Sequence, residues 1–68
     1  MDNPEPTVAE DTLRGVSAIA AFIGENEPRT FRLCARKLIP VGKQGNSYVA
    51  SKRALRMHYA RLTGAEVA

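Results

Sequence analysis

The chain has 68 residues, a formal net charge of +3 and one cysteine. This length allows one small domain with a modest core, which disfavours an enclosed catalytic pocket. One cysteine excludes an internal disulfide and a multi-cysteine zinc site, and no apolar run approaches the ~18 to 20 residues of a membrane span. We therefore expect a cytoplasmic protein that is not an enzyme, has no cofactor or metal and does not bind a membrane.

The charges are divided unevenly along the chain. Residues 1–11 hold four acids and no base, whereas residues 12–68 hold all ten lysines and arginines and three acids, a balance of +7. A folded part this basic indicates a polyanionic partner, although a solvated basic surface gives the same composition. Residues 1–11 also hold two prolines and little that could be buried. They are predicted to be a disordered acidic arm.

The first predicted helix is short and apolar. Leu13 is expected to be the first core residue, with Gly15 in a turn, and the helix to begin at Val16 or Ser17. Gly24 is well placed to end it as a left-handed cap. Apolar residues at spacings of three and four predict its buried face, which comprises Ile19, Ala20, Phe22 and Ile23.

A second helix follows after a tight turn. Asn26 or Glu27 is expected to cap it, with Pro28 in its first turn, and the helix is expected to continue to Lys37. Its apolar residues at helical spacing predict a buried side that comprises Phe31, Cys34, Ala35 and Leu38. On this side Cys34 is interpreted as a small core residue rather than a reactive thiol.

Arginines occupy the opposite side of this second helix. Arg29, Arg32 and Arg36 recur at steps of three and four, with Thr30 beside them. Like charges on one stripe repel one another, and a polyanion would relieve that cost. Arginine also suits forked hydrogen bonds to a guanine edge or a phosphate. Two helices joined by a turn, the second bearing these arginines, are the layout of a helix-turn-helix that enters the DNA major groove; a solvated face is the alternative.

The segment from Ile39 to Ala50 predicts a β-hairpin. Pro40 ends the preceding helix, and β-forming residues then flank Gln44-Gly45-Asn46. Polar residues at the tip of this wing are candidates for contact with the DNA backbone or minor groove: Lys43, Gln44 and Asn46. Tyr48 is expected to pack on the first helix rather than to stack on a base.

The last predicted helix begins after Ser51 and runs to Leu62, with an inner face of Leu55, Tyr59 and Leu62. His58 is interpreted as partly buried packing. The first turns of this helix hold three cations, Lys52, Arg53 and Arg56. Positive charge there opposes the helix dipole, and contacts to phosphate would explain why it is present. The predicted fold is mainly α with a small β-hairpin, ordered helix–turn–helix–wing–helix. It spans residues 12–63, between the disordered arm (1–11) and a frayed C-terminus (64–68).

The combined pattern resembles a known family. The motifs are Ile19-Ala20-x-x-Ile23-Gly24, Pro28-Arg29-Thr30-Phe31, Leu38-Ile39-Pro40-x-Gly42-Lys43-x-Gly45 and Tyr48-Val49-Ala50-Ser51-x-x-Ala54-Leu55. Together they are similar to the MerR-like winged helix-turn-helix of excisionases, also called recombination directionality factors. The resemblance covers residues 13–62. It departs from the family at Glu27, where serine or threonine is usual, and at Lys37, where glycine is usual.

The resemblance implies a sequence-specific DNA-binding protein with no catalytic activity. It would bind double-stranded DNA cooperatively, as head-to-tail copies near an attachment site, and bend it. It would thereby direct a tyrosine recombinase integrase to excise a mobile element or prophage. Position by position, Arg29, Thr30 and Arg32 would face the major groove and Arg36 the backbone. A small transcriptional regulator and a protein-interaction module remain alternatives.

Overall fold

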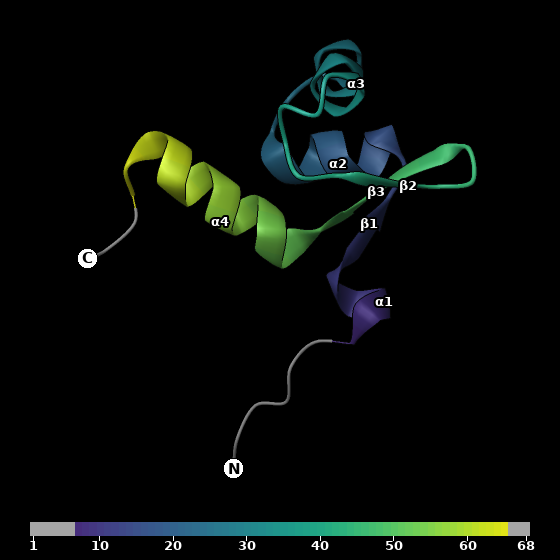
Figure 1. Cartoon of the computed structure of the whole chain (residues 1–68), viewed down its shortest axis with the longest axis horizontal. Coiled ribbons are helices and arrows are strands. Elements are labelled where there is room, and N and C mark those ends of the chain that lie inside the picture. The colour runs from purple at the N-terminus through teal and green to yellow at the C-terminus, as the bar shows by residue number, and fades with distance from the viewer. Residues whose placement is uncertain (1–6, 66–68) are drawn as a thin grey trace.

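Glycines and prolines divide the chain into short elements, and the computed structural model describes residues 7–65 (Figure 1). This part holds four helices and three strands, in the order α1 (Val8–Asp11), β1 (Thr12–Arg14), α2 (Val16–Ile23), α3 (Glu27–Ala35), β2 (Gly42–Gln44), β3 (Ser47–Ser51) and α4 (Lys52–Thr63). The described chain is therefore a small mixed α/β structure. The prediction of a mainly α fold with one hairpin is correct for the hairpin and for the presence of α2, α3 and α4. It omits α1 and β1, and it extends α3 to Lys37, whereas the helix ends at Ala35.

The strands form one antiparallel sheet with β3 in the middle. β2 and β3 make the predicted hairpin, whose turn, Gly45-Asn46, lies between the paired residues Gln44 and Ser47. Gly45 has a φ of 64°, a conformation that glycine adopts without steric cost. β1 pairs with the other edge of β3 through residues 12–14. The sequence does not predict β1, because three residues are too few for an alternating pattern to be visible.

The core lies where the sheet meets α2, α3 and the start of α4. One cluster of buried apolar residues joins these elements: Leu13, Ile19, Cys34, Ile39, Ala50 and Leu55. Ile19 and Leu55 are completely buried. The core positions predicted for Leu13, Ile19, Leu55 and Cys34 are confirmed. Burial also raises the pKa of the Cys34 thiol, which fits a packing role.

α3 is rotated relative to the predicted burial pattern. Of its predicted buried residues only Cys34 is buried, whereas Phe31 is 53% exposed, Leu38 is 56% exposed and Ala35 is exposed too. Thr30 takes the inner position instead, with an exposed fraction of 0%. Thr30 and Cys34 lie one helical turn apart, and their small side chains let α3 approach α2 closely. The prediction fails because it assigns only apolar residues to the buried side, whereas Thr30 can be buried since its hydroxyl donates to the Asn26 carbonyl.

α4 extends away from the sheet towards the C-terminus (Figure 1). Ser51 caps it as predicted, its Oγ accepting a hydrogen bond from the Ala54 N–H at 3.1 Å. Tyr59 is half-buried, but Leu62 is 67% exposed and does not belong to the inner face. The last turn of α4 lies beyond the layer formed by α2 and the sheet (Figure 1), and Leu62 there borders an open groove with Leu38 and Tyr59. No helix within residues 7–65 is long and apolar enough to cross a bilayer.

Residues 7–11 form a capped helical turn, although they belong to the segment predicted as a disordered arm. Thr7 and Glu10 form a capping box: the Thr7 N–H donates to Glu10 Oε1 at 2.9 Å, and the Glu10 N–H donates to Thr7 Oγ1 at 3.1 Å. The pattern Thr-x-x-Glu is itself a signal of a helix start. The resulting turn, α1, leads directly into β1. Residues 1–6 of the predicted arm and 66–68 of the predicted frayed end lie outside the described residues.

α3 ends in a Schellman motif that uses a lysine where glycine is usual. The Lys37 N–H donates to the Cys34 carbonyl at 3.1 Å, and the Leu38 N–H donates to the Leu33 carbonyl at 2.9 Å. Lys37 has a φ of 55°, and within residues 7–65 every other residue with positive φ is a glycine. The turn after α3 therefore keeps the geometry that glycine would give, at a steric cost to Lys37.

Replacing Lys37 with glycine is therefore expected to stabilise the protein by about 1 kcal/mol, because glycine has no Cβ to clash in the left-handed region. Urea denaturation followed by circular dichroism measures this change. Lys37→Ala is the matched control, since it removes the same charge and keeps the Cβ, and it should leave stability nearly unchanged. Equal effects of the two substitutions would show that the charge, not the backbone, sets the cost.

Candidate nucleic-acid interface

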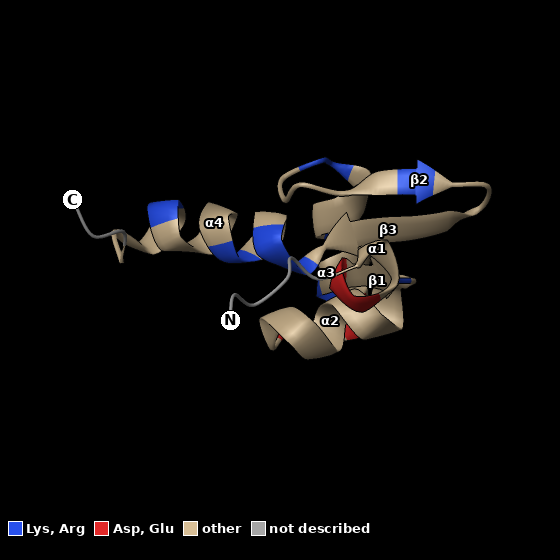
Figure 2. Ribbon diagram, turned by 90° about the horizontal axis from the view of Figure 1, so that it is seen from below, with Lys and Arg blue, Asp and Glu red and all other residues tan. Residues whose placement is uncertain are grey.

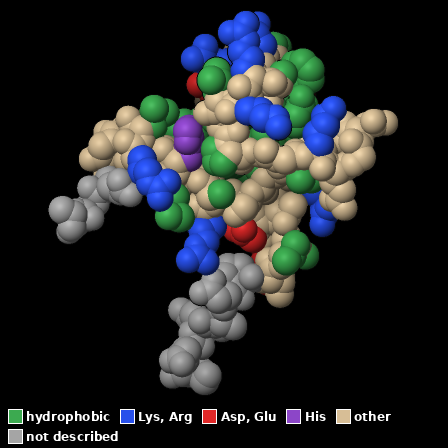
Figure 3. Space-filling model, viewed as in Figure 1, with side chains coloured by type: hydrophobic (Ala, Val, Ile, Leu, Met, Phe, Trp, Pro, Cys, Tyr) green, Lys and Arg blue, Asp and Glu red, His purple; other side chains and the backbone are tan. Residues whose placement is uncertain are grey.

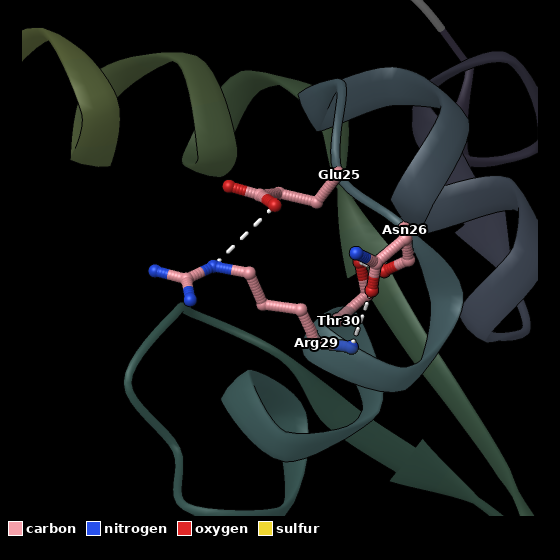
Figure 4. A network of polar contacts seen from close by, with 4 residues as sticks. All are labelled: Glu25, Asn26, Arg29 and Thr30. Carbon is pink, nitrogen blue, oxygen red and sulfur yellow. Dashed lines mark hydrogen bonds and ion pairs between the residues drawn. The ribbon is translucent and has the colours of Figure 1, made fainter.

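The turn between α2 and α3 fixes where α3 begins. Gly24 ends α2 in the left-handed conformation, as predicted. Asn26, rather than Glu27, is the cap of α3: its Oδ1 accepts a hydrogen bond from the Arg29 N–H at 2.8 Å (Figure 4). Pro28 lies in the first turn, where a missing N–H costs nothing. These contacts fix the residue at which α3 begins.

The arginine stripe lies on the outer side of α3. Arg29, Arg32 and Arg36 are all exposed, and with Leu33 and Leu38 they line one shallow cavity of about 160 Å³. Figure 3 shows lysine and arginine side chains gathered over α3, with hydrophobic atoms beside them. The structure therefore brings together three of the predicted DNA-binding residues on one accessible surface.

The three arginines differ in their ion pairs with the described residues. Arg29 Nε lies 3.4 Å from Glu25 Oε1, an exposed contact (Figure 4). Such surface ion pairs contribute about 1 kcal/mol or less, so a phosphate can displace Glu25 at little cost. Within residues 7–65, neither Arg32 nor Arg36 forms an ion pair. Their charge is thus available to a polyanion.

Thr30 does not belong to this surface, which corrects its prediction as a DNA-facing residue. Its side chain is completely buried, and its hydroxyl donates to the Asn26 carbonyl at 2.8 Å. That bond satisfies the hydroxyl locally, so threonine can occupy a core position without an unmet polar group. Its role is to hold α3 against the core.

The predicted tip residues of the hairpin are exposed but differ in their contacts. Lys43 lies over the ring of Tyr48, with Nζ 5.1 Å from the ring centroid. Gln44 Oε1 accepts a hydrogen bond from Arg14 Nη1 at 3.2 Å. Asn46 lies in the turn itself. The hairpin therefore presents a lysine and polar groups beside α3, and Gln44 binds a further cation that is not among the predicted site residues.

That further cation is Arg14, on β1. β1 and β2 lie on opposite sides of the middle strand β3. The exposed Arg14 side chain nevertheless reaches across β3 to Gln44 on β2. The alternation around buried Leu13 is the only sequence signal for an outward Arg14. Three residues are too few to reveal it.

The start of α4 carries the third group of predicted cations. Lys52 is half-buried, whereas Arg53 and Arg56 are exposed. Arg56 also lies over the Phe22 ring of α2, with Cζ 5.3 Å from the centroid. Figure 2 shows lysine and arginine on α4 and β2, and acidic residues on α1 and at the end of α2. Cations from α3, the hairpin and α4 are therefore all accessible to solvent.

Asp11 offsets the cations at the start of α4. Its Oδ2 accepts a hydrogen bond from the Ser51 hydroxyl at 2.5 Å, and its Oδ1 accepts one from the Arg53 N–H at 3.1 Å. The bond from Ser51 is the largest cause of a lowered Asp11 pKa; burial opposes it, and the Arg53 N–H and the charges of Arg56 and Lys52 support it. An acid at a helix N-terminus is favourable. Asp11, which lies outside α4, therefore compensates for the unfavourable interaction between the helix dipole and the cations in the first turns of α4.

Asp11→Ala is expected to destabilise the protein near neutral pH and to have little effect in acid. Because the Asp11 pKa is lower in the folded than in the unfolded protein, its carboxylate stabilises the fold above about pH 4, the usual range of an unfolded aspartate. That stabilisation disappears as pH falls through the folded-state pKa. Thermal melts of the wild-type protein and of Asp11→Ala, from acid to neutral pH, measure this difference in stability. A difference between them that stays constant with pH would contradict the linkage.

The remaining reactive side chains do not form a second site. His58 is half-buried and lies edge-on to Tyr59, with ring centroids 5.1 Å apart, as its predicted packing role requires. Burial, followed by the charge of Glu25, raises the pKa of Tyr59. Among residues 7–65, no three side chains of His, Cys, Asp or Glu come together as metal ligands.

No protein-family model, curated protein or solved structure matches this chain.

Proposed function

We propose that this protein is a sequence-specific DNA-binding protein of the winged helix-turn-helix class, in which α3 is the recognition helix and β2–β3 is the wing. The observation that carries the proposal is the exposed row of Arg29, Arg32 and Arg36 along one side of α3. Two of these arginines have no acidic partner within residues 7–65. A helix of this width fits the major groove of B-DNA, where arginine forms forked hydrogen bonds to guanine.

The other basic groups have positions suited to the DNA backbone. Lys43 and Asn46 lie on the wing, and Lys52 and Arg53 lie at the start of α4. Lysine and arginine contacts to phosphate give affinity and orientation without reading sequence. In this proposal α3 reads base edges, while the wing and α4 hold the duplex against it.

Within that class we favour an excisionase, on the strength of the resemblance across residues 13–62. It binds near an attachment site, bends the DNA and directs a tyrosine recombinase to excision, without catalysing a reaction itself. Smooth bending costs on the order of 1 to 6 kcal/mol, which contacts have to offset. One module this small offers a limited interface. Several copies bound head-to-tail supply the missing affinity.

A gel-shift titration tests the proposal. Purified full-length chain is titrated against DNA from the flanks of its own gene, at two salt concentrations, with and without nonspecific competitor. We expect stepwise, cooperative shifts that survive competitor and weaken steeply with salt. Shifts lost to competitor would leave only a nonspecific basic surface, and no shift would reject DNA binding. Sites at a promoter with no recombination site nearby would favour a transcriptional regulator.

A second candidate, a protein-interaction module, is favoured by a different observation. A groove of about 410 Å³ runs between the segment after α3 and the outer half of α4, lined partly by Leu33, Leu38, Tyr59 and Leu62. Leu38 and Leu62 are among the most exposed large apolar residues of the described chain. If leucine substitutions in this groove abolish the biological effect and arginine substitutions on α3 do not, the protein-interaction function is the correct one.

A further inference from the structure

Phe31 is a large aromatic side chain on the outside of the proposed recognition helix. It is 53% exposed, although it belongs to a small protein with few aromatic residues to bury. Its ring meets that of Tyr48 on β3 edge-on, with centroids 6.0 Å apart and planes at 78°. Lys43 of the hairpin covers the Tyr48 ring. Phe31 thus contacts the hairpin through Tyr48, while about half of its surface stays exposed.

Phe31 has an exposed apolar neighbour on the same side of α3. Ala35 follows it by four residues, so the two lie one above the other along the helix. Arg32 and Arg36 follow the same spacing one residue further on, and therefore form the adjacent row. The outer surface of α3 has two parallel halves: an apolar half towards the hairpin and an arginine half beyond it.

The two halves face different surroundings. The apolar half borders Tyr48 and Lys43 of the hairpin. The arginine half borders α4, because Arg29 lines the same groove as Tyr59 and Leu62. A duplex lying across α3 would meet both halves at once. The ligand therefore has to offer hydrogen-bond acceptors beside an exposed apolar group.

We propose that Phe31, supported by Tyr48 and flanked by Ala35, is a specificity-determining residue that contacts the 5-methyl group of a thymine in the major groove. This inference rests on the proposed DNA-binding function. Thymine is the only standard base that presents a methyl group there, and guanine presents the paired acceptors that arginine binds. A recognition helix with these two halves reads a thymine next to a guanine. Tyr48 holds the Phe31 ring in place, so the contact requires little ordering on binding.

The test first changes the DNA, by removing the 5-methyl group of thymine, and only then changes the protein. The full-length chain first selects binding sites from a randomised duplex library. Each thymine of the selected site is then replaced singly by deoxyuridine, which lacks only the 5-methyl group. We expect one thymine at which this change weakens wild-type binding about three- to tenfold, the order expected for losing one buried methyl contact. Other thymines should change affinity less than about twofold.

Protein variants assign that methyl contact to Phe31. Phe31→Ala should bind the thymine and deoxyuridine sites equally, whereas Phe31→Leu, which keeps an apolar side chain, should retain part of the preference. Val8→Ala is the matched control, because Val8 is 78% exposed on α1, at the opposite end of the molecule from α3 (Figure 1). It should retain the full preference. Circular dichroism melts establish that each variant is folded.

The outcomes separate this inference from the function on which it rests. If the library yields no enriched site, sequence-specific binding fails and the inference fails with it. If a site is enriched but no thymine shows methyl dependence, the inference is overturned and the DNA-binding function stands. If the methyl dependence persists in Phe31→Ala, another residue reads the thymine and Phe31 does not. If Phe31→Ala is unfolded, Phe31→Gln replaces it in the test. A folded Phe31→Gln that keeps the full preference for thymine over deoxyuridine would also show that Phe31 does not read the methyl group.

Discussion

Replacing Arg32 and Arg36 with alanine is expected to weaken specific DNA binding about a hundredfold, because each forked contact to a base or phosphate contributes about 1 to 3 kcal/mol. Both side chains are exposed and form no ion pair within residues 7–65, so their loss should not disturb the fold. Gel-shift or fluorescence anisotropy titrations at several salt concentrations measure the effect. The slope of log affinity against log salt should fall by roughly 0.9 for each phosphate contact removed.

Single substitutions give the matched control for this experiment. Arg32→Ala and Arg36→Ala each remove one positive charge, as does Arg61→Ala in the last turn of α4. If the surface of α3 binds DNA, the first two weaken binding much more than the third. Equal effects of all three would mean that overall charge, and not the arginine row, attracts DNA.

Leu55→Ala is expected to cost about 2 to 5 kcal/mol of folding stability. Leu55 is completely buried and connects α4 with residues of the sheet, α2 and α3 in one core cluster. A single small core rarely supplies more than about 3 to 5 kcal/mol in total. The variant should therefore be largely unfolded at room temperature, which urea titration and far-ultraviolet circular dichroism measure.

The same helix supplies the control. Leu62→Ala deletes identical atoms from a side chain that is 67% exposed, so its stability should change by about 0.5 kcal/mol or less. A comparable loss at both positions would contradict the arrangement in which α4 packs on the core through Leu55 and Tyr59 while Leu62 stays exposed. It would instead indicate that the outer half of α4 packs against something in solution.

The elements with strong local signals are predictable from the sequence. Gly24 and Gly64 end α2 and α4, Ser51 caps α4, and the Gly45-Asn46 turn identifies the hairpin. α1 has an equally local signal in its capping box. β1 has none, because its three residues are defined only by pairing with β3, far along the chain. Tertiary pairing of that kind is not visible in periodicity.

The candidate interface is also predictable only where local sequence signals determine it. Helical spacing places Arg29, Arg32 and Arg36 on one surface, and the structure has them there. Spacing does not fix the rotation of α3 about its axis. That rotation depends on Thr30 being satisfied by a local hydrogen bond and therefore buried, which leaves Phe31 outside. The hydrogen bonds of Asp11 to Ser51 and Arg53 likewise depend on tertiary structure alone.

The position of β3 late in the chain has a consequence for folding during synthesis. β3 is the middle strand, so neither sheet pairing can form before residues 47–51 have been made. The bond between Asp11 and the Arg53 N–H closes a loop across 42 positions. Closing such long loops costs entropy before any contact repays it, which slows folding. We therefore expect the sheet and its core to stay unformed until β3 and the start of α4 have emerged, and then to form in one cooperative step.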